Sequence, residues 1–138
     1  MEECLFCKII RKEIPAQFIF EDDESVAVLD VSPRAPGHTM VLPRSHAAHI
    51  MELNEESVGP VFRTVRRVTA ALQKAFTPDG FTIGINHGRA AGQAIDHLHV
   101  HIIPRWRDDG GHSIHSLVTN TPRESLEEIR SKIVNVFE

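Results

Sequence analysis

The stretch Asp96–Pro104 reads DHLHVHIIP and places a histidine at every second position, His97, His99 and His101. Side chains of a β-strand alternate between its two faces, and the chain rises about 3.3 Å per residue. The spacing therefore predicts imidazoles on one face at intervals of roughly 6.6 Å, with apolar residues on the other face. Core packing does not favour such a row, because each buried ring needs hydrogen-bond partners. The stretch predicts a strand with one face for packing and one for chemistry.

Three uses compete for the imidazole face. Alternate histidines of a strand can ligate a tetrahedral zinc ion. Imidazole also titrates near neutral pH, which suits nucleophilic or acid–base catalysis. The third reading is a solvated polar face on an edge strand. The preceding loop, residues 89–93, favours phosphate held against a nucleophile, because its glycine permits close approach of backbone amides to an anion. A plain flexible hairpin is the alternative for that loop.

Length and composition bound the class of protein. The 138 residues fit a single domain, predicted to span 1–138. The net charge of −4 argues against a nucleic-acid partner. No apolar run is long enough for a membrane span, and the first twenty residues lack a secretory signal. Only two cysteines are present, so we expect a reducing, cytoplasmic location.

Hydrophobic patterning predicts an α+β fold with a mainly antiparallel sheet, because five strands are broken by only one long helix. A doubly wound α/β fold fits less well. In the long helix, Gly59-Pro60 suggests that the first turn is a separate element. Thr121-Pro122-Arg123-Glu124 resembles a capping box that begins a C-terminal helix. The expected strands are 17–21, 25–30, 38–43, 80–86 and 98–104, and the expected helices are 4–11, 54–76 and a C-terminal one.

Several blocks of the chain together resemble a known family. The run 97–103, HLHVHII, is similar to the signature of the histidine triad (HIT) superfamily. Further blocks resemble its Hint branch, the histidine triad nucleotide-binding proteins. In chain order these blocks are FCKII (6–10) with EIP (13–15), FEDD (20–23), LDVSP (29–33), PGH (36–38), LPRSH (42–46) and AGQ (91–93). They cover about residues 4–105 and leave 106–138 as a variable tail.

The resemblance implies a HIT-like fold, a five-stranded antiparallel sheet with one long and one short helix, to which this chain adds a C-terminal helix. It also implies a homodimer with a ten-stranded sheet. The implied activity is cleavage of adenylated or guanylated small molecules at the α-phosphate, through a nucleotidyl-histidine intermediate, with release of AMP. A dinucleoside polyphosphate hydrolase or phosphorylase, and a nucleotide-binding interaction protein with incidental catalysis, are the alternatives.

Catalytic roles follow from the resemblance by position. His99 resembles the nucleophile, and His101 the residue that hydrogen-bonds the phosphate oxygens. His97 and His38 resemble the supporting imidazole network. The family places the Nδ1 proton of the nucleophile on a backbone carbonyl, which leaves the Nε2 lone pair free for phosphorus.

A purine nucleoside monophosphate is the implied ligand. Asp30 resembles the carboxylate that accepts the ribose hydroxyls, with Val31 beside it, and Phe6 and Ile9 resemble the walls around the base. From the residues alone, Asp30 is equally a turn cap, and Phe6 and Ile9 are ordinary core. The full implied nucleotide-binding set is Phe6, Ile9, Asp30, Val31, Asn86, Gly92, Gln93, Ala94, His99 and His101.

Ala94 departs from the family pattern. Hint proteins that hydrolyse adenosine phosphoramidates generally carry serine after the Gly-Gln pair, where its hydroxyl assists the departing amine. Alanine cannot donate a proton. We therefore hypothesise that amine leaving groups are handled less well here, and that a better leaving group such as an acyl phosphate or polyphosphate is tolerated.

The Cys4-x-x-Cys7 pair is open to three interpretations: half of a zinc site, a redox motif, or two inert thiols. Some Hint-like proteins complete a tetrahedral site on this pair with two histidines, which by position are His46 and His97. The resemblance thus implies one structural Zn²⁺ per subunit, with no open position for a reactive water.

Overall fold

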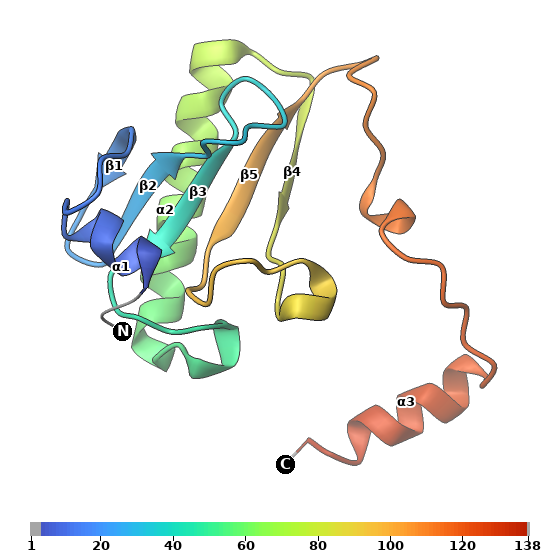
Figure 1. The fold of residues 1–138 in the computed structure, drawn as a ribbon. Coiled ribbons are helices and arrows are strands. Elements are labelled where there is room, and N and C mark those ends of the chain that lie inside the picture. Colours follow the sequence, from blue (N-terminus) through green and yellow to red (C-terminus); the bar gives the residue numbers. More distant parts are fainter. Residues whose placement is uncertain (1–3, 138) are drawn as a thin grey trace.

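The computed structural model describes residues 4–137, and a five-stranded antiparallel sheet forms its centre (Figure 1). The strand order is β1-β2-β3-β5-β4, so β5 is hydrogen-bonded on both sides. This is the sheet that the sequence predicted. The strands are β1 (Phe18–Glu21), β2 (Ser25–Leu29), β3 (Thr39–Pro43), β4 (Gly80–Gly84) and β5 (Val100–Arg105).

The histidine strand begins later than predicted. β5 starts at Val100, so His97 and His99 precede it. The reason is a loop contact: the backbone N–H of Leu98 donates to the carbonyl of Ala47 at 2.7 Å, outside the β3–β5 ladder. The predicted alternation of faces still holds through this segment. Leu98, Val100 and Ile102 all belong to the buried cluster beneath the long helix, which leaves the histidines to the other face.

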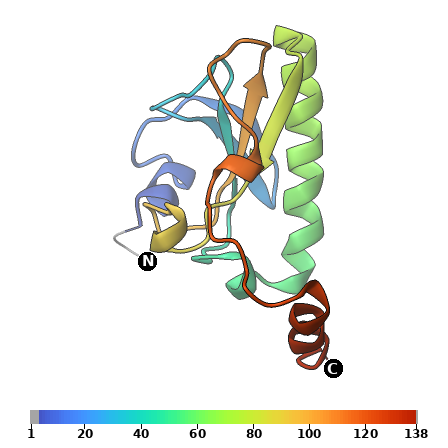
Figure 2. The same cartoon turned by 90° about the vertical axis from the view of Figure 1, so that its right-hand side faces the viewer.

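The long helix α2 (Glu55–Phe76) covers one face of the sheet (Figure 2). Val61, Val65 and Leu72 form its buried stripe. The expected separate first turn is wrong, because α2 runs continuously through Pro60. Proline removes one backbone hydrogen bond there, but Ser57 before it and Val61 after it are both buried at helical spacing, which favours one unbroken helix. Within residues 4–137, no helix is both long and apolar enough to cross a membrane.

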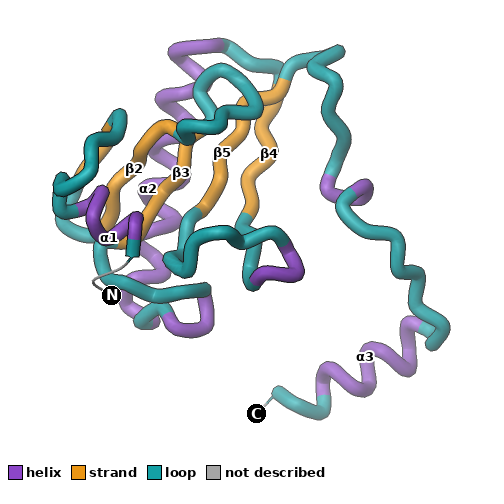
Figure 3. Tube along the Cα trace, viewed as in Figure 1, coloured by secondary structure: helices purple, strands orange, loops and turns teal. Residues whose placement is uncertain are grey.

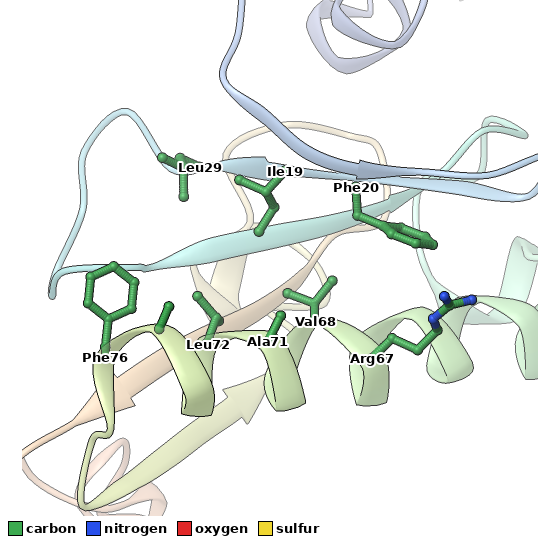
Figure 4. Close-up of a pocket in the computed structure, with 9 residues that line it drawn as sticks. Ile19, Phe20, Leu29, Arg67, Val68, Ala71, Leu72 and Phe76 are labelled. Carbon is green, nitrogen blue, oxygen red and sulfur yellow. The ribbon is translucent and has the colours of Figure 1, made fainter.

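A groove of about 440 Å³ lies where α2 faces the first two strands. Figure 4 shows its aliphatic side chains, with the Phe20 ring and the Arg67 guanidinium at one end. The guanidinium carbon lies 5.1 Å from the ring centroid. This groove is on the helix face of the sheet, opposite the imidazoles. Its lining residues are Ile19, Phe20, Leu29, Arg67, Val68, Ala71, Leu72, Ala75 and Phe76.

The short helix α1 (Leu5–Ile10) lies on the opposite face of the sheet (Figure 2). Its first turn is capped by the Cys4 sulfur, which accepts a hydrogen bond from the Cys7 backbone at 3.3 Å. Phe6, Ile9 and Ile10 anchor the helix in a second buried cluster. The other buried members of that cluster are Val26, Val28, Met40 and Leu42. α1 is therefore held on the face that carries the histidines.

The chain beyond β5 forms an extended arm that ends in the helix α3 (Leu126–Val134) (Figures 1 and 3). The C-terminal helix was predicted, but its start was wrong. The cap is Ser125, whose hydroxyl accepts from the Glu128 backbone at 3.1 Å while the Glu128 carboxylate accepts from the Ser125 backbone at 3.0 Å. Residues 121–124 and residues 125–128 both match the capping pattern, and only 125–128 lead directly into the helix. No residue of α3 is buried.

Candidate active site

The three histidines of the opening stretch lie together on the α1 side of the sheet. His97 is completely buried, His99 is 7% exposed, and the His101 side chain is 20% exposed. The centroids of the His99 and His101 rings are 4.9 Å apart. Access to the site therefore increases along the row, from the ring beneath α1 to the ring beside β4.

His99 has a fixed orientation. Its Nδ1 lies 2.7 Å from the carbonyl oxygen of His97, which can only accept, so Nδ1 carries the proton and donates. The other nitrogen, Nε2, then keeps its lone pair. Phe6 meets the ring edge to face with 5.0 Å between centroids, which holds it from the α1 side. A neutral imidazole held this way can act as a nucleophile or as a base.

A second chain of hydrogen bonds sets the tautomers of His38 and His101. The backbone N–H of Arg34 donates to His38 Nδ1 at 3.1 Å. His38 Nε2 must then carry the proton, and it lies 2.9 Å from His101 Nδ1. His101 accepts that proton's hydrogen bond, so its own N–H is at Nε2. The site thus pairs a free lone pair on His99 with an N–H donor on His101.

Burial keeps His38 and His101, the imidazole pair, neutral. The pKa of His101 is lowered from 6.5 to about 4, chiefly because burial desolvates the ring and also because of the neighbouring His99 and His38 rings, against the opposing attraction of Asp30. Burial also lowers the pKa of His38, again opposed by Asp30. Both rings are uncharged near pH 7, so each offers an N–H hydrogen bond rather than a proton.

Asp30 caps a turn, as one of its two expected roles required, and also faces the imidazoles of His38 and His101. One carboxylate oxygen accepts from the Ser32 backbone at 2.8 Å, as a turn cap does. The other lies 3.4 Å from His38 Nε2 and 3.9 Å from His101 Nδ1. Val31 next to it is 90% exposed. Phe6 and Ile9 are buried in the α1 cluster, so they serve as core whatever else they contact.

The loop before β5 is held by Gln93. Its amide NH₂ donates to the carbonyls of Ala48 at 2.7 Å and Ile95 at 3.0 Å, and its amide oxygen accepts from the Gly88 backbone at 2.8 Å. Both side-chain donors are therefore engaged within the protein. Gly92 has φ +101° and lies against the Asn86 side chain. Ala94 is exposed.

Cys4, Cys7, His46 and His97 form a compact cluster beneath α1, with ligand atoms all within 4.8 Å of one another. His97 Nδ1 lies 3.5 Å from the Cys4 sulfur and 3.6 Å from the Cys7 sulfur, and His46 Nδ1 lies 3.3 Å from the Cys7 sulfur. Zn–S and Zn–N bonds of about 2.3 and 2.0 Å at tetrahedral angles place S and N about 3.5 Å apart, so the set fits zinc.

The second nitrogen of His97 completes that arrangement. Nε2 lies 2.9 Å from the Pro43 carbonyl, so it carries the proton and Nδ1 offers its lone pair to the cluster. Ligating histidines commonly have such a partner on the other nitrogen. Burial lowers the His97 pKa to about 4 and raises the Cys7 pKa to about 11. Metal binding at these thiols would therefore release protons.

Two features near the site were not predicted from the sequence. The rings of His49 and His87 stack with 4.4 Å between centroids at an interplanar angle of 11°. A cavity of about 480 Å³ also lies between the imidazole pair and the C-terminal arm. Neither carries a local signal, because each depends on loops that the fold alone brings together.

A family model, the HIT domain, matches residues 11–108. The chain belongs to the HIT family. A HIT-family relative named adenosine 5'-monophosphoramidase, from Schizosaccharomyces pombe, is 37% identical over 94% of this chain and 98% of its own. An adenylylsulfatase of Arabidopsis thaliana is 39% identical over 78% of this chain and 54% of its own. These named relatives are hydrolases of the HIT family, and they confirm the predicted family.

Solved HIT structures have the same fold. A HIT family protein from Bacillus subtilis matches with a TM-score of 0.87 at 34% identity, over 99% of this chain and 98% of that one. A histidine triad family protein from Mycobacterium smegmatis, described as zinc-bound, matches with a TM-score of 0.74 at 28% identity, over 99% of each chain. The predicted HIT-like fold is thereby confirmed.

Proposed function

We propose that this chain is a nucleotidyl hydrolase or transferase that cleaves adenylated small molecules at the α-phosphate and releases AMP. The observation that carries the proposal is the pairing of tautomers: His99 keeps a lone pair at Nε2, and His101 offers an N–H from its own Nε2. The names of the relatives, a monophosphoramidase and an adenylylsulfatase, support adenosine 5'-monophosphate as the common part of the substrate.

The reaction has two displacements. The lone pair of His99 Nε2 attacks the α-phosphorus, the bond from phosphorus to the leaving group breaks, and the leaving group departs with the electron pair. His101 donates a hydrogen bond to a non-bridging oxygen, where negative charge develops. Water then attacks phosphorus, the N–P bond breaks, His99 regains its lone pair, and the water proton passes to solvent. His38 acts through His101, as a positioning residue.

The nucleoside binds beside α1 in this proposal. The free oxygen of Asp30 accepts the ribose hydroxyls, and Val31 and Ile9 contact the base, with Phe6 behind His99. Val31 is 90% exposed, which is unfavourable for an apolar side chain. A bound purine ring would cover it and remove this exposure. The phosphate lies against the loop before β5, whose contributing residues are Asn86, Gly92, Gln93 and Ala94.

We propose further that the cluster of Cys4, Cys7, His46 and His97 holds one structural zinc. Its support is the donor set, the 3.3–3.6 Å separations between sulfur and nitrogen, and the likeness to a zinc-bound relative. A bound zinc would join α1 to the segment that carries the nucleophile. All four positions of a tetrahedral ion are filled by protein, so its role is to hold structure.

The assembly that we propose is a homodimer with a ten-stranded sheet, of single-domain subunits located in the cytoplasm. The sheet has edges at β1 and β4. β1 is short and its register is broken between Phe18 and Phe20, which disfavours pairing, whereas β4 has a regular ladder. α3 extends beyond the β4 edge (Figure 1). Leu126 in α3 and Phe137 after its end are 82% and 77% exposed, and a second subunit would cover them.

The test is release of AMP from adenosine 5'-phosphoramidate and adenylyl sulfate by the wild-type protein and by His99→Ala. We expect the variant to lose at least about 10³-fold in kcat, since removing a nucleophile typically costs more than that. Intact mass after an alkaline quench should show an adenylyl adduct on the wild type alone. A His99→Ala protein that retains activity within tenfold would refute the mechanism.

A further inference from the structure

The cavity beside the imidazole pair is bounded by the C-terminal arm. It measures about 480 Å³, which is within the range of small-molecule sites. Its inner wall is His38, His101 and the face of β4 and β5, and its outer wall is the arm segment 112–117. The residues that line it are Arg34, His38, Thr82, Ile83, Gly84, Ile85, Asn86, His101, Ile103, His112, Ser113, Ile114 and Leu117.

This cavity is separate from the volume assigned to the nucleoside. Phe6 contacts His99 from the α1 side, at 5.0 Å between centroids, whereas the cavity has His101 in its wall and neither Phe6 nor His99. Among residues 4–137, those that line the cavity come from the β2–β3 loop, β4 and the two residues after it, β5 and the arm, and none comes from α1. A phosphate held at the imidazoles would thus have the nucleoside on one side and this cavity on the other.

The chemistry of the lining selects what would enter. Five of the lining side chains are aliphatic: Ile83, Ile85, Ile103, Ile114 and Leu117. The described residues of the lining include one guanidinium, Arg34, and no carboxylate; Asp30, which contacts His38 and His101, is not among them. An apolar body is favoured here, and an ammonium group would lose hydration without gaining a carboxylate partner from the lining.

We infer that this cavity is the leaving-group subsite and that it takes an apolar carboxylic acid, presented as an acyl adenylate. The inference rests on the proposed function and names its substrate class. In the first displacement the bond between phosphorus and the acyl oxygen breaks, and the acid departs as a carboxylate with the electron pair. That departure needs no proton, which agrees with the absence of a hydroxyl at Ala94.

The arm thereby becomes a specificity element. Ile114 and Leu117 are 60% and 77% exposed, so substitutions there leave the core intact. Val118 is 73% exposed and does not line the cavity, which makes it a matched control. The comparison is kcat/KM for hexanoyl adenylate against 6-aminohexanoyl adenylate, two substrates of equal length that differ by a terminal ammonium group. Adenosine 5'-phosphoramidate, which has no body to fill the cavity, reports the chemical step alone.

We expect the wild type to prefer hexanoyl adenylate by about tenfold or more, the scale of discrimination by apolar pockets. Leu117→Glu and Ile114→Glu should each lower that ratio severalfold, while Val118→Glu keeps both the ratio and phosphoramidate turnover. Equal turnover of both acyl adenylates, or equal ratios for Leu117→Glu and Val118→Glu, would overturn the subsite with the proposed function intact. If no adenylate released AMP, the proposed function and the subsite would both fall.

Discussion

His38 and His101 share a hydrogen bond of 2.9 Å between Nε2 and Nδ1, and this bond determines which nitrogen of His101 faces the site. His38 is itself fixed by the backbone N–H of Arg34. A backbone group outside the sheet thus sets the donor presented to the substrate. The relationship makes His38 a residue that acts on the phosphate through His101.

Replacing His38 should therefore separate positioning from binding. His38→Ala removes the donor to His101 Nδ1. We expect kcat to fall about 10²-fold with KM little changed, which is the usual cost of losing a group that orients a functional histidine. His38→Gln can still donate an amide N–H and should recover much of kcat. Steady-state kinetics on adenosine 5'-phosphoramidate test this. Equal losses in both variants would mean that the ring serves packing instead.

Acid should destabilise the fold through His101. Its pKa is about 4 in the fold and 6.5 as a free side chain, so between these values the unfolded chain binds more protons. Stability is full above about pH 6.5 and declines as the pH falls toward 4, by on the order of 3 kcal/mol for this group. Urea unfolding at pH 7 and pH 4.5 measures the decline. His101→Gln should show a smaller one, and an unchanged pH dependence would contradict the assignment.

Ala94→Ser should restore a donor for amine leaving groups. We expect phosphoramidate turnover to rise by up to about 10²-fold, the usual contribution of one positioned general acid. Adenylates with carboxylate leaving groups should change little, because they need no proton. Rates measured on both substrates decide the matter. Phosphoramidate turnover that agrees within about twofold between wild type and variant would reject the hypothesis.

The amount of bound zinc should depend on the thiols of Cys4 and Cys7. Protein purified without added metal is expected to carry about one zinc per subunit, and Cys4→Ser should lower that content sharply. A strong chelator should lower Tm by roughly 10 °C in the wild type, because metal binding stabilises only the folded state. The same chelator should have little effect on Cys4→Ser. A content far below one zinc, unaltered by the substitution, would exclude the site.

Gly37 should resist substitution because of its backbone. Its φ of +85° is disfavoured for other residues, and an added Cβ would approach the Phe76 ring to 2.9 Å. Gly37→Ala should lower the free energy of unfolding by about 1–3 kcal/mol and disturb His38, its neighbour in sequence. Gly80 has open space and no such φ, so Gly80→Ala is the matched control. Equal stability of the two variants in urea would contradict this account.

The sheet and the histidine face were predictable because they depend on local periodicity. Alternating residues of one segment define two faces wherever that segment pairs, so the faces survived even though β5 starts at Val100. The exact starts were less predictable. Leu98 leaves the ladder for Ala47, and Ser125 replaces Thr121 as a cap, through contacts that no short window of sequence contains.

The site divides in the same way. The clustering of Cys4 with His97 across 93 positions was expected from the family resemblance, and the structure brings them together. The stacking of His49 on His87, and the wall that Leu117 adds beside His101, depend on how loops and the arm return to the sheet. The spacing of these residues along the chain does not predict such contacts.

β5 has a hydrogen-bonded neighbour on each side and the α2 core beneath it, so His101 within it, and His97 and His99 just before it, lie in a firmly held part of the molecule. The arm has neither constraint, since no residue of α3 is buried. Substitutions in the arm would therefore change the outer wall of the cavity and leave the histidines of the inner wall in place. New substrates would be acquired at the C-terminus, without any change to the chemistry that consumes them.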